Sequence, residues 1–280
     1  MTEHIKPLTS MRGIAALLVV LHHFFYYLLG DIGKEIGLYT KFFFNGYLWV
    51  DFFFILSGFI MAHVYLKDFS SAINRRNYRI YLFSRFARIY PLHILIIFLF
   101  IGLELTKGYS AFTGSQNLTA LFSNIFLLQA FDFNNPPWFG GATYWNQPSW
   151  SISAEWIAYL FLPLLLFLLS KIRKVTAVVV YLSALFCLFF LVKLTYGHLN
   201  FIGVHSIIRC ILESTLGIIT YQVYNSKINR RHLKRDWIFI LSLIGVFMVM
   251  HYNWNDVLII PIFCLLILSA SINNRVVAKI

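Results

Sequence analysis

The sequence predicts an all-α protein, a polytopic transmembrane bundle with about 8–10 spans. Two observations carry this prediction. Of the 280 residues, 59% are apolar and only 12% are charged, whereas soluble domains average about 45–50% apolar and about 25% charged residues. The apolar residues also gather in runs that approach the roughly 20 residues needed to cross a bilayer. We therefore interpret residues 1–280 as a single domain of an integral membrane protein.

The individual spans follow from the apolar runs. The candidate spans are approximately 12–29, 47–66, 90–106, 149–170, 175–195, 203–224, 237–252 and 255–272. The first run follows two basic residues in the manner of a signal peptide, but it lacks a small-residue cleavage site, so we expect a retained helix. The cysteines Cys187, Cys210 and Cys264 lie far apart inside apolar runs, so we interpret them as core residues and expect no metal site.

Positive charge is concentrated in short links between the apolar runs. The chain has 23 Lys and Arg against 11 Asp and Glu. In a soluble protein this excess would suggest a nucleic-acid partner, but here it is typical of cytoplasmic loops near anionic membrane lipid, so we expect no nucleic acid. The links expected in the cytoplasm are 67–88, 171–174 and 225–235. The links expected outside are 30–46, 107–117 and 196–202.

The apolar segment 118–131 does not fit a simple alternation of inside and outside loops. Either it is re-entrant or interfacial, or one loop breaks the charge rule. The following loop, 132–148, is rich in Pro, Gly, Asn and aromatic residues. This composition favours an ordered cap at the membrane interface over another span.

Two polar residues share one face of the first candidate span. Arg12 and His23 are eleven residues apart, which on a helix gives nearly the same direction and a separation of about 16 Å along the axis. Arg12 then lies at the cytoplasmic mouth, where it suits an anionic ligand, while His23 lies deeper and suits proton chemistry. The alternative is a topology-setting arginine and a histidine hydrogen-bonded in the core. His22 points elsewhere and is expected to play a supporting part.

Two arginines precede the third candidate span. Arg85 and Arg88 are three residues apart and share a helix face. Pro91 follows them, and proline fits the first turn of a helix, so we expect the cytoplasmic entry of the span here. Two guanidinium groups side by side match phosphate oxygens well. A plain positively charged flank is the alternative.

Polar stripes mark two later helices. Ser151, Glu155 and Tyr159 follow at spacings of four, and a glutamate inside a span needs a partner that donates hydrogen bonds. Glu155 is expected either to form a structural ion pair or to organise a site. Arg209 and Glu213 are also four apart, and for them we favour a structural pair within one helix.

The stretch "GYLWVDFFFILSGFI" places the carboxylate of Asp51 in an apolar segment. Gly58 lies seven residues later on the same face, where another helix can approach closely. Asp51 is expected either to be satisfied by a neighbouring helix or to support a polar core by orienting His23 or an arginine.

In their order along the chain, these motifs resemble the acyltransferase 3 family of membrane O-acyltransferases. The resemblance rests on Arg12 with His23, "GYLWVDFFFILSGFI", "RFARIYP", "WSISAEWIAYL" and "RCILESTLGII". It implies transfer of an acyl group, usually acetyl, from cytoplasmic acyl-CoA to a hydroxyl of a carbohydrate or glycolipid acceptor, as in lipopolysaccharide O-antigen or exopolysaccharide.

The resemblance also implies roles for single residues. His23 becomes the catalytic histidine, and Glu155 and Asp51 become further site residues. Arg12, Arg85 and Arg88 become ligands of the coenzyme A phosphates or essential site residues. Acetyl-CoA is then a co-substrate, no cofactor is tightly bound, and the bacterial inner membrane is the expected location. No serine or cysteine beside a base stands out as a nucleophile, which favours direct transfer.

Two departures from the family pattern keep other functions open. Similar proteins continue into a further helix with another histidine, so we expect this chain to lack the last C-terminal helix. We also expect no appended esterase-like domain. The alternatives are a transporter or flippase of a lipid-linked sugar, in which intramembrane charges line a pathway, and an inactive fragment of the same family.

Overall fold

The computed structural model describes residues 5–108, 117–131, 145–195, 197–200, 202–226 and 236–272. Within these ranges the secondary structure is helical, without strands, which confirms the predicted fold class. In the described part of the chain, five helical segments are long and apolar enough to cross a membrane: Lys6–Tyr27, Phe44–Phe69, Arg75–Leu105, Gln147–Ser170 and Lys174–Leu194. The later apolar segments Asp236–His251 and Asp256–Ile272 are shorter.

The described chain divides into two compact units. The first unit comprises residues 1–66, 171–200 and 212–280, and the second comprises 67–170 and 201–211. The boundary falls inside two helices, α3 (Trp49–Phe69) and α8 (Val204–Asn225). Each unit is described below by itself.

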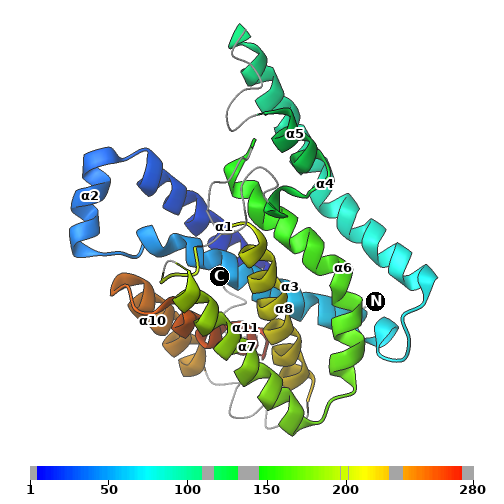
Figure 1. Cartoon of the computed structure of the whole chain (residues 1–280). Helices are drawn as coiled ribbons and strands as arrows, with labels where there is room; N and C mark the ends of the chain where they lie inside the picture. Colours follow the sequence, from blue (N-terminus) through cyan, green and yellow to red (C-terminus); the bar gives the residue numbers. More distant parts are fainter. Residues whose placement is uncertain are drawn as a thin grey trace. The chain divides into compact units, whose positions relative to one another are not determined.

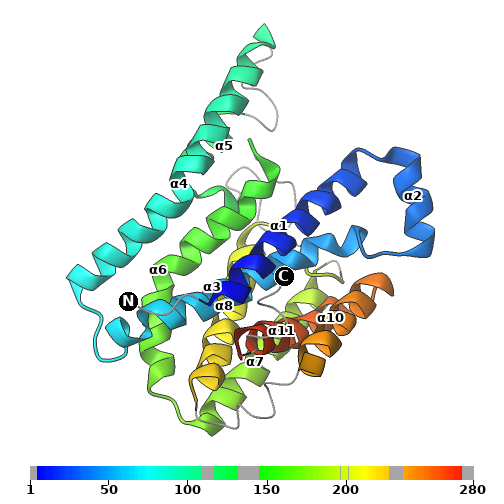
Figure 2. The same ribbon diagram turned by 180° about the vertical axis from the view of Figure 1, so that it is seen from behind.

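The first unit begins with α1 (Lys6–Tyr27) and contains most of α3. Between them lie α2 (Gly30–Tyr39) and the short helix η1 (Phe44–Leu48), which packs against α1. The unit also contains α7 (Lys174–Leu194), α10 (Asp236–His251), η6 (Asp256–Leu258) and α11 (Ile259–Ile272). Figures 1 and 2 both show α10 beside α11. The helix α2 was not predicted, since 30–46 was interpreted as a plain link.

A glycine-mediated contact joins α3 to α8 in the first unit. A Cβ atom added at Gly58 would overlap the backbone of Ser214, and one added at Gly217 would overlap the backbone of Ile55. The two helix backbones therefore touch where their side chains are absent. This confirms that another helix approaches Gly58 closely and identifies it as α8.

The second unit is dominated by α4 (Arg75–Leu105) and α6 (Trp150–Ser170), which lie side by side in both views (Figures 1 and 2). The connection between them contains α5 (Leu118–Ile125), η4 (Gln129–Phe131) and η5 (Gln147–Ser149). At about 12 Å, α5 is too short to cross a bilayer, which agrees with the doubt about 118–131 as a span. Of the predicted cap 132–148, residues 132–144 lie outside the described ranges.

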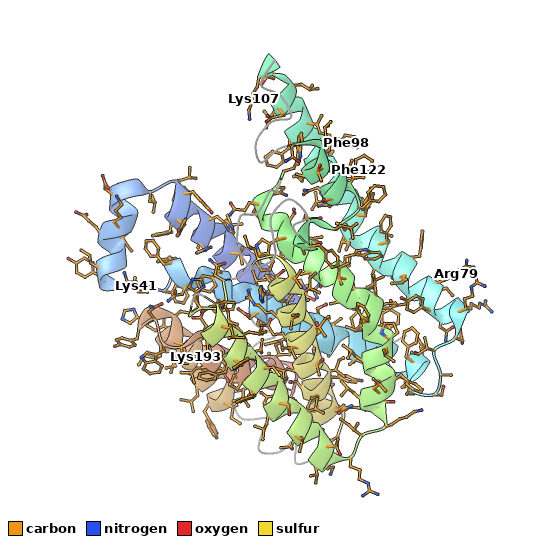
Figure 3. The ribbon with its side chains drawn as sticks, in the orientation of Figure 1. Lys41, Arg79, Phe98, Lys107, Phe122 and Lys193 are labelled. Carbon is orange, nitrogen blue, oxygen red and sulfur yellow. The ribbon has the colours of Figure 1, made fainter. Side chains whose placement is uncertain are left out.

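The start of α4 corrects one prediction. The span was expected to begin near residue 90 with Pro91 in its first turn, but the helix begins at Arg75 and contains Pro91 in its interior. The side chain of Asn74 accepts a hydrogen bond from the backbone of Asn77, which caps the new start. Figure 3 shows Arg79 toward one end of α4 and Lys107 beyond the other, with Phe98 and Phe122 in the region where α4 and α5 run together. The basic residues thus form the first turns of the helix itself.

Candidate active site

The predicted site residues fall equally into the two units. Arg12, His23 and Asp51 belong to the first unit, and Arg85, Arg88 and Glu155 belong to the second.

A single helix carries both Arg12 and His23. Both side chains are half-buried in α1, and no break in the helix separates them. The predicted common face and the separation of about 16 Å along the axis therefore hold for this helix. The helix therefore carries the guanidinium of Arg12 near one end and the imidazole of His23 about three turns further along.

The two nitrogens of His23 have different surroundings. Nδ1 lies 2.8 Å from the carbonyl oxygen of Val19, one turn earlier. A carbonyl can only accept a hydrogen bond, so Nδ1 donates and carries the hydrogen. In the neutral imidazole, Nε2 then keeps its lone pair, which is the requirement for accepting a proton from a hydroxyl. The ring contacts of His23 are with His22, at 5.1 Å between centroids, and with Tyr27, at 6.1 Å.

His22 anchors α1 against η1. It is buried, and its Nδ1 lies 2.9 Å from the carbonyl oxygen of Phe43. A Cβ atom at Gly46 would lie 2.5 Å from the Cβ of His22, so the backbone of η1 rests directly on this side chain. His22 therefore has the surroundings of the supporting residue that was predicted.

Asp51 is completely buried in the first turn of α3. A carboxylate at this position is favoured by the partial positive charge of the helix N-terminus. Nδ1 of His23 donates to the carbonyl of Val19 and not to Asp51. Both interpretations of Asp51 stay predictions: a carboxylate satisfied by a neighbouring helix, or one that supports a polar core by orienting His23 or an arginine.

In the second unit, side-chain contacts fix the register of α4 against α6. The hydroxyl of Tyr81 donates to the carbonyl of Tyr159, at 3.1 Å. One turn further, the rings of Phe86 and Trp156 lie 5.6 Å apart. The residue numbers rise on one helix as they fall on the other, so the two helices are antiparallel. Glu155 consequently lies at the level of Arg85.

The register brings Arg85 and Glu155 to one level without an ion pair between them. Within the described ranges, Glu155 accepts a 2.6 Å hydrogen bond from the hydroxyl of Tyr159, four residues later. A guanidinium nitrogen of Arg85 donates to the hydroxyl of Ser84, at 3.1 Å. Arg88 lies about one turn along α4 from Arg85 and is exposed. This part of α4 therefore carries two guanidinium groups near the level of a carboxylate whose position is fixed by a tyrosine.

The other polar residues singled out in the sequence lie in α6 and α8. Ser151 does not share a hydrogen bond with Glu155, because its hydroxyl donates to the carbonyl of Pro148, at 3.0 Å, near the start of α6. Arg209 and Glu213 are both completely buried in α8. The guanidinium of Arg209 lies 5.7 Å from the centroid of the Trp150 ring, a cation–π contact within the second unit.

Sequence reasoning missed several buried polar groups, among them His93 and Asp256. His93 is buried in α4, and its Nε2 lies 2.8 Å from the carbonyl oxygen of Asn124. Asp256 is buried at the start of η6. Each interrupts an apolar context, "YPLHIL" and "WNDVLII", and a polar residue in such a context was a usable signal.

Comparison with known proteins supplies the remaining evidence. A family model described as "Acyltransferase domain" matches residues 6–276. The chain is 34% identical over 128 residues to "Acyltransferase MdmB" of Streptomyces mycarofaciens, covering 45% of this chain and 30% of that protein. It is 36% identical over 90 residues to "Protein 2 in picA locus" of Rhizobium radiobacter, covering 32% of this chain and 40% of that protein. The chain thus aligns with less than half of each of these relatives. No solved structure matches it.

Proposed function

The chain belongs to the acyltransferase family whose model matches residues 6–276, and from this membership we propose that it is an integral membrane O-acyltransferase. The donor is cytoplasmic acyl-CoA, most simply acetyl-CoA, and the acceptor is a hydroxyl of a cell-surface or exported carbohydrate. The membrane is the bacterial inner membrane. The observation that carries the proposal is the Nε2 of His23, left with its lone pair because Nδ1 donates to Val19.

The proposed reaction is a direct transfer. Nε2 of His23 takes the proton of the acceptor hydroxyl while the oxygen attacks the thioester carbonyl of acyl-CoA. Collapse of the tetrahedral intermediate breaks the carbon–sulfur bond, and the imidazolium returns the proton to the departing thiolate of coenzyme A. Atoms and charge balance without an enzyme-bound acyl group, so no serine or cysteine nucleophile is needed.

The arginines suit the binding of coenzyme A. Its phosphates are polyanionic, and guanidinium groups engage two phosphate oxygens at once. Arg88 is exposed, and Arg85 lies one turn away on α4. Arg12 supplies a further cation on the face of α1 that carries His23. Glu155, held by Tyr159, is proposed to organise the arginines at its level.

The deciding experiment uses the purified protein in detergent or nanodiscs with radiolabelled acetyl-CoA and extracted membrane glycans. We expect label to enter the glycan and an equal amount of free thiol to appear. The variant His23→Asn tests the base, because an asparagine side chain still donates to Val19 but has no basic nitrogen. A folded wild-type protein that neither binds coenzyme A nor releases thiol with any acceptor would contradict the proposal.

The same experiment separates the acyltransferase from a sugar flippase. A flippase moves its lipid-linked sugar without acyl-CoA, so glycan export in intact cells would continue when acyl transfer stops. We expect the opposite for this protein: loss of acyl groups from the exported glycan in the His23→Asn strain, with unchanged glycan export.

A further inference from the structure

A buried carboxylate far from the predicted motifs is connected to the histidines of α1. Asp256 lies at the start of η6 and is 4% exposed. A buried carboxylate is costly unless hydrogen bonds satisfy it. Its Oδ2 accepts two of them, from the hydroxyl of Tyr47 at 2.8 Å and from the backbone N–H of Leu199 at 2.6 Å. Asp256 thereby ties η1 to the turn before α8 and to the start of α11.

Tyr47 transmits this connection to α1. Its ring lies 6.0 Å from the ring of His22, at an interplanar angle of 68°, and 6.3 Å from the ring of His198. Tyr47 and Gly46 are neighbours in η1, and the backbone at Gly46 rests on His22. The hydrogen bond from Tyr47 to Asp256 therefore helps to fix the position of η1, and with it the contact between the η1 backbone and His22.

His22 is in turn the neighbour of the predicted base. The rings of His22 and His23 meet edge to face, 5.1 Å apart. His22 is fixed on its other side by the carbonyl of Phe43, which belongs to the segment leading into η1. Movement of η1 would thus shift His22 and, through the ring contact, His23.

We propose that Asp256 and Tyr47 are positioning residues that hold the His22–His23 pair, and so aim the Nε2 of His23. This inference rests on the proposed role of His23 as the base. Neither residue takes part in the reaction. Asp256 accepts a hydrogen bond from Tyr47, this bond fixes η1, and η1 in turn supports His22 and His23. All the contacts involved lie within the first unit.

The test uses Tyr47→Phe, which removes only the hydroxyl, with Tyr26→Phe as its matched control. Tyr26 is 60% exposed and its ring lies 6.0 Å from His22, so the control makes the same chemical change beside the same histidine. Asp256→Asn is the second variant, because it keeps the shape of the side chain but removes its charge. We expect kcat to fall about 10- to 100-fold in Tyr47→Phe and Asp256→Asn. The Michaelis constant for acetyl-CoA should not change, and Tyr26→Phe should behave as wild type.

A second readout needs no acyl transfer. Diethyl pyrocarbonate modifies neutral imidazoles, and mass spectrometry gives the rate at each histidine of the full-length protein in detergent. We expect the rate at His23 to change in Tyr47→Phe and to stay constant in Tyr26→Phe, with His63 as the internal reference. If the wild type transfers no acyl group, the proposed function fails while this rate still decides the inference. A wild-type rate at His23 in Tyr47→Phe would overturn it, as would a lowered melting temperature with normal kcat.

Discussion

In His23, one hydrogen bond distinguishes the two ring nitrogens. Nδ1 faces its own helix and donates to Val19 at 2.8 Å, and Nε2 is the nitrogen that we propose as the base. We expect His23→Asn and His23→Gln to lose about 10²- to 10⁴-fold in turnover, the range of general base catalysis. Binding of coenzyme A, measured by equilibrium dialysis, should stay at the wild-type level because the phosphate ligands are elsewhere. Unchanged turnover in His23→Asn would remove His23 from the reaction.

Arg88 is the residue of α4 for which we propose a role in binding coenzyme A. It is exposed on α4, so its substitution disturbs little packing. We expect Arg88→Ala to raise the dissociation constant of coenzyme A about tenfold, which corresponds to roughly 1.4 kcal/mol. Arg88→Lys should recover only part of the affinity, because an ammonium group cannot engage two oxygens in a fixed fork.

The control for Arg88 is Arg173→Ala, since Arg173 is also an exposed arginine but precedes α7. Affinity should be unchanged in this control. Added salt should weaken coenzyme A binding by the wild type more than by Arg88→Ala, because exposed charges are screened. Equal affinity of the wild type and the double variant of Arg85 and Arg88 would refute the phosphate role.

At the scale of the helices, the contact of α3 with α8 depends on glycines, which have no side chain to separate the two backbones. An added methyl group at Gly58 meets the backbone of Ser214, which cannot move aside as a flexible side chain can. We expect Gly58→Ala to destabilise the protein by about 1–3 kcal/mol. Thermal unfolding in detergent measures this change.

Gly102 is the matched control for Gly58. It lies inside α4 and has no atom within 4 Å of an added Cβ. Alanine there should be neutral or stabilise the helix by roughly 0.5–1 kcal/mol, since glycine is a poor helix former. Equal melting temperatures for Gly58→Ala and Gly102→Ala would mean that the backbones of α3 and α8 are not in contact.

The helices also show which features the sequence could predict. Uniformly apolar helices such as α6 and α7 begin and end close to the predicted spans, because hydrophobicity alone defines them. The start of α4 was missed because residues 75–89 are rich in arginine, and the cap at Asn74 is a local signal that hydropathy ignores. Pro91 was then assigned to a first turn that lies elsewhere.

The candidate site divides in the same way. The common face of Arg12 and His23 follows from helical periodicity within one segment, so it could be predicted. The bond between Tyr47 and Asp256 joins residues 209 positions apart, and no local pattern contains it. The level of Glu155 with Arg85 likewise depends on the register of α4 against α6, which tertiary contacts fix.

At the scale of the whole chain, the antiparallel course of α4 and α6 bears on topology. The hydroxyl of Ser170 donates to the carbonyl of Ser70, at 3.3 Å, so the end of α6 lies beside the segment before α4. In the sequence, the short α5 lies between two helices that are each long and apolar enough to cross a membrane. We therefore expect the basic segments 67–88 and 171–174 on one side of the membrane, the cytoplasmic side. The segment between α4 and α6, which contains α5, is then expected on the outer side of the membrane.

Single cysteines test this orientation in living cells. In a variant whose native cysteines Cys187, Cys210 and Cys264 are replaced, we expect cysteines at Lys34 and Lys107 to react with a membrane-impermeant maleimide added outside. Cysteines at Arg76 and Lys171 should react only after permeabilisation, because positive charge is retained in the cytoplasm. All four positions are exposed, so reactivity reports the side of the membrane and not burial. Labelling of Arg76→Cys from outside would reverse the orientation, and with it the supply of cytoplasmic acyl-CoA to the arginines of α4.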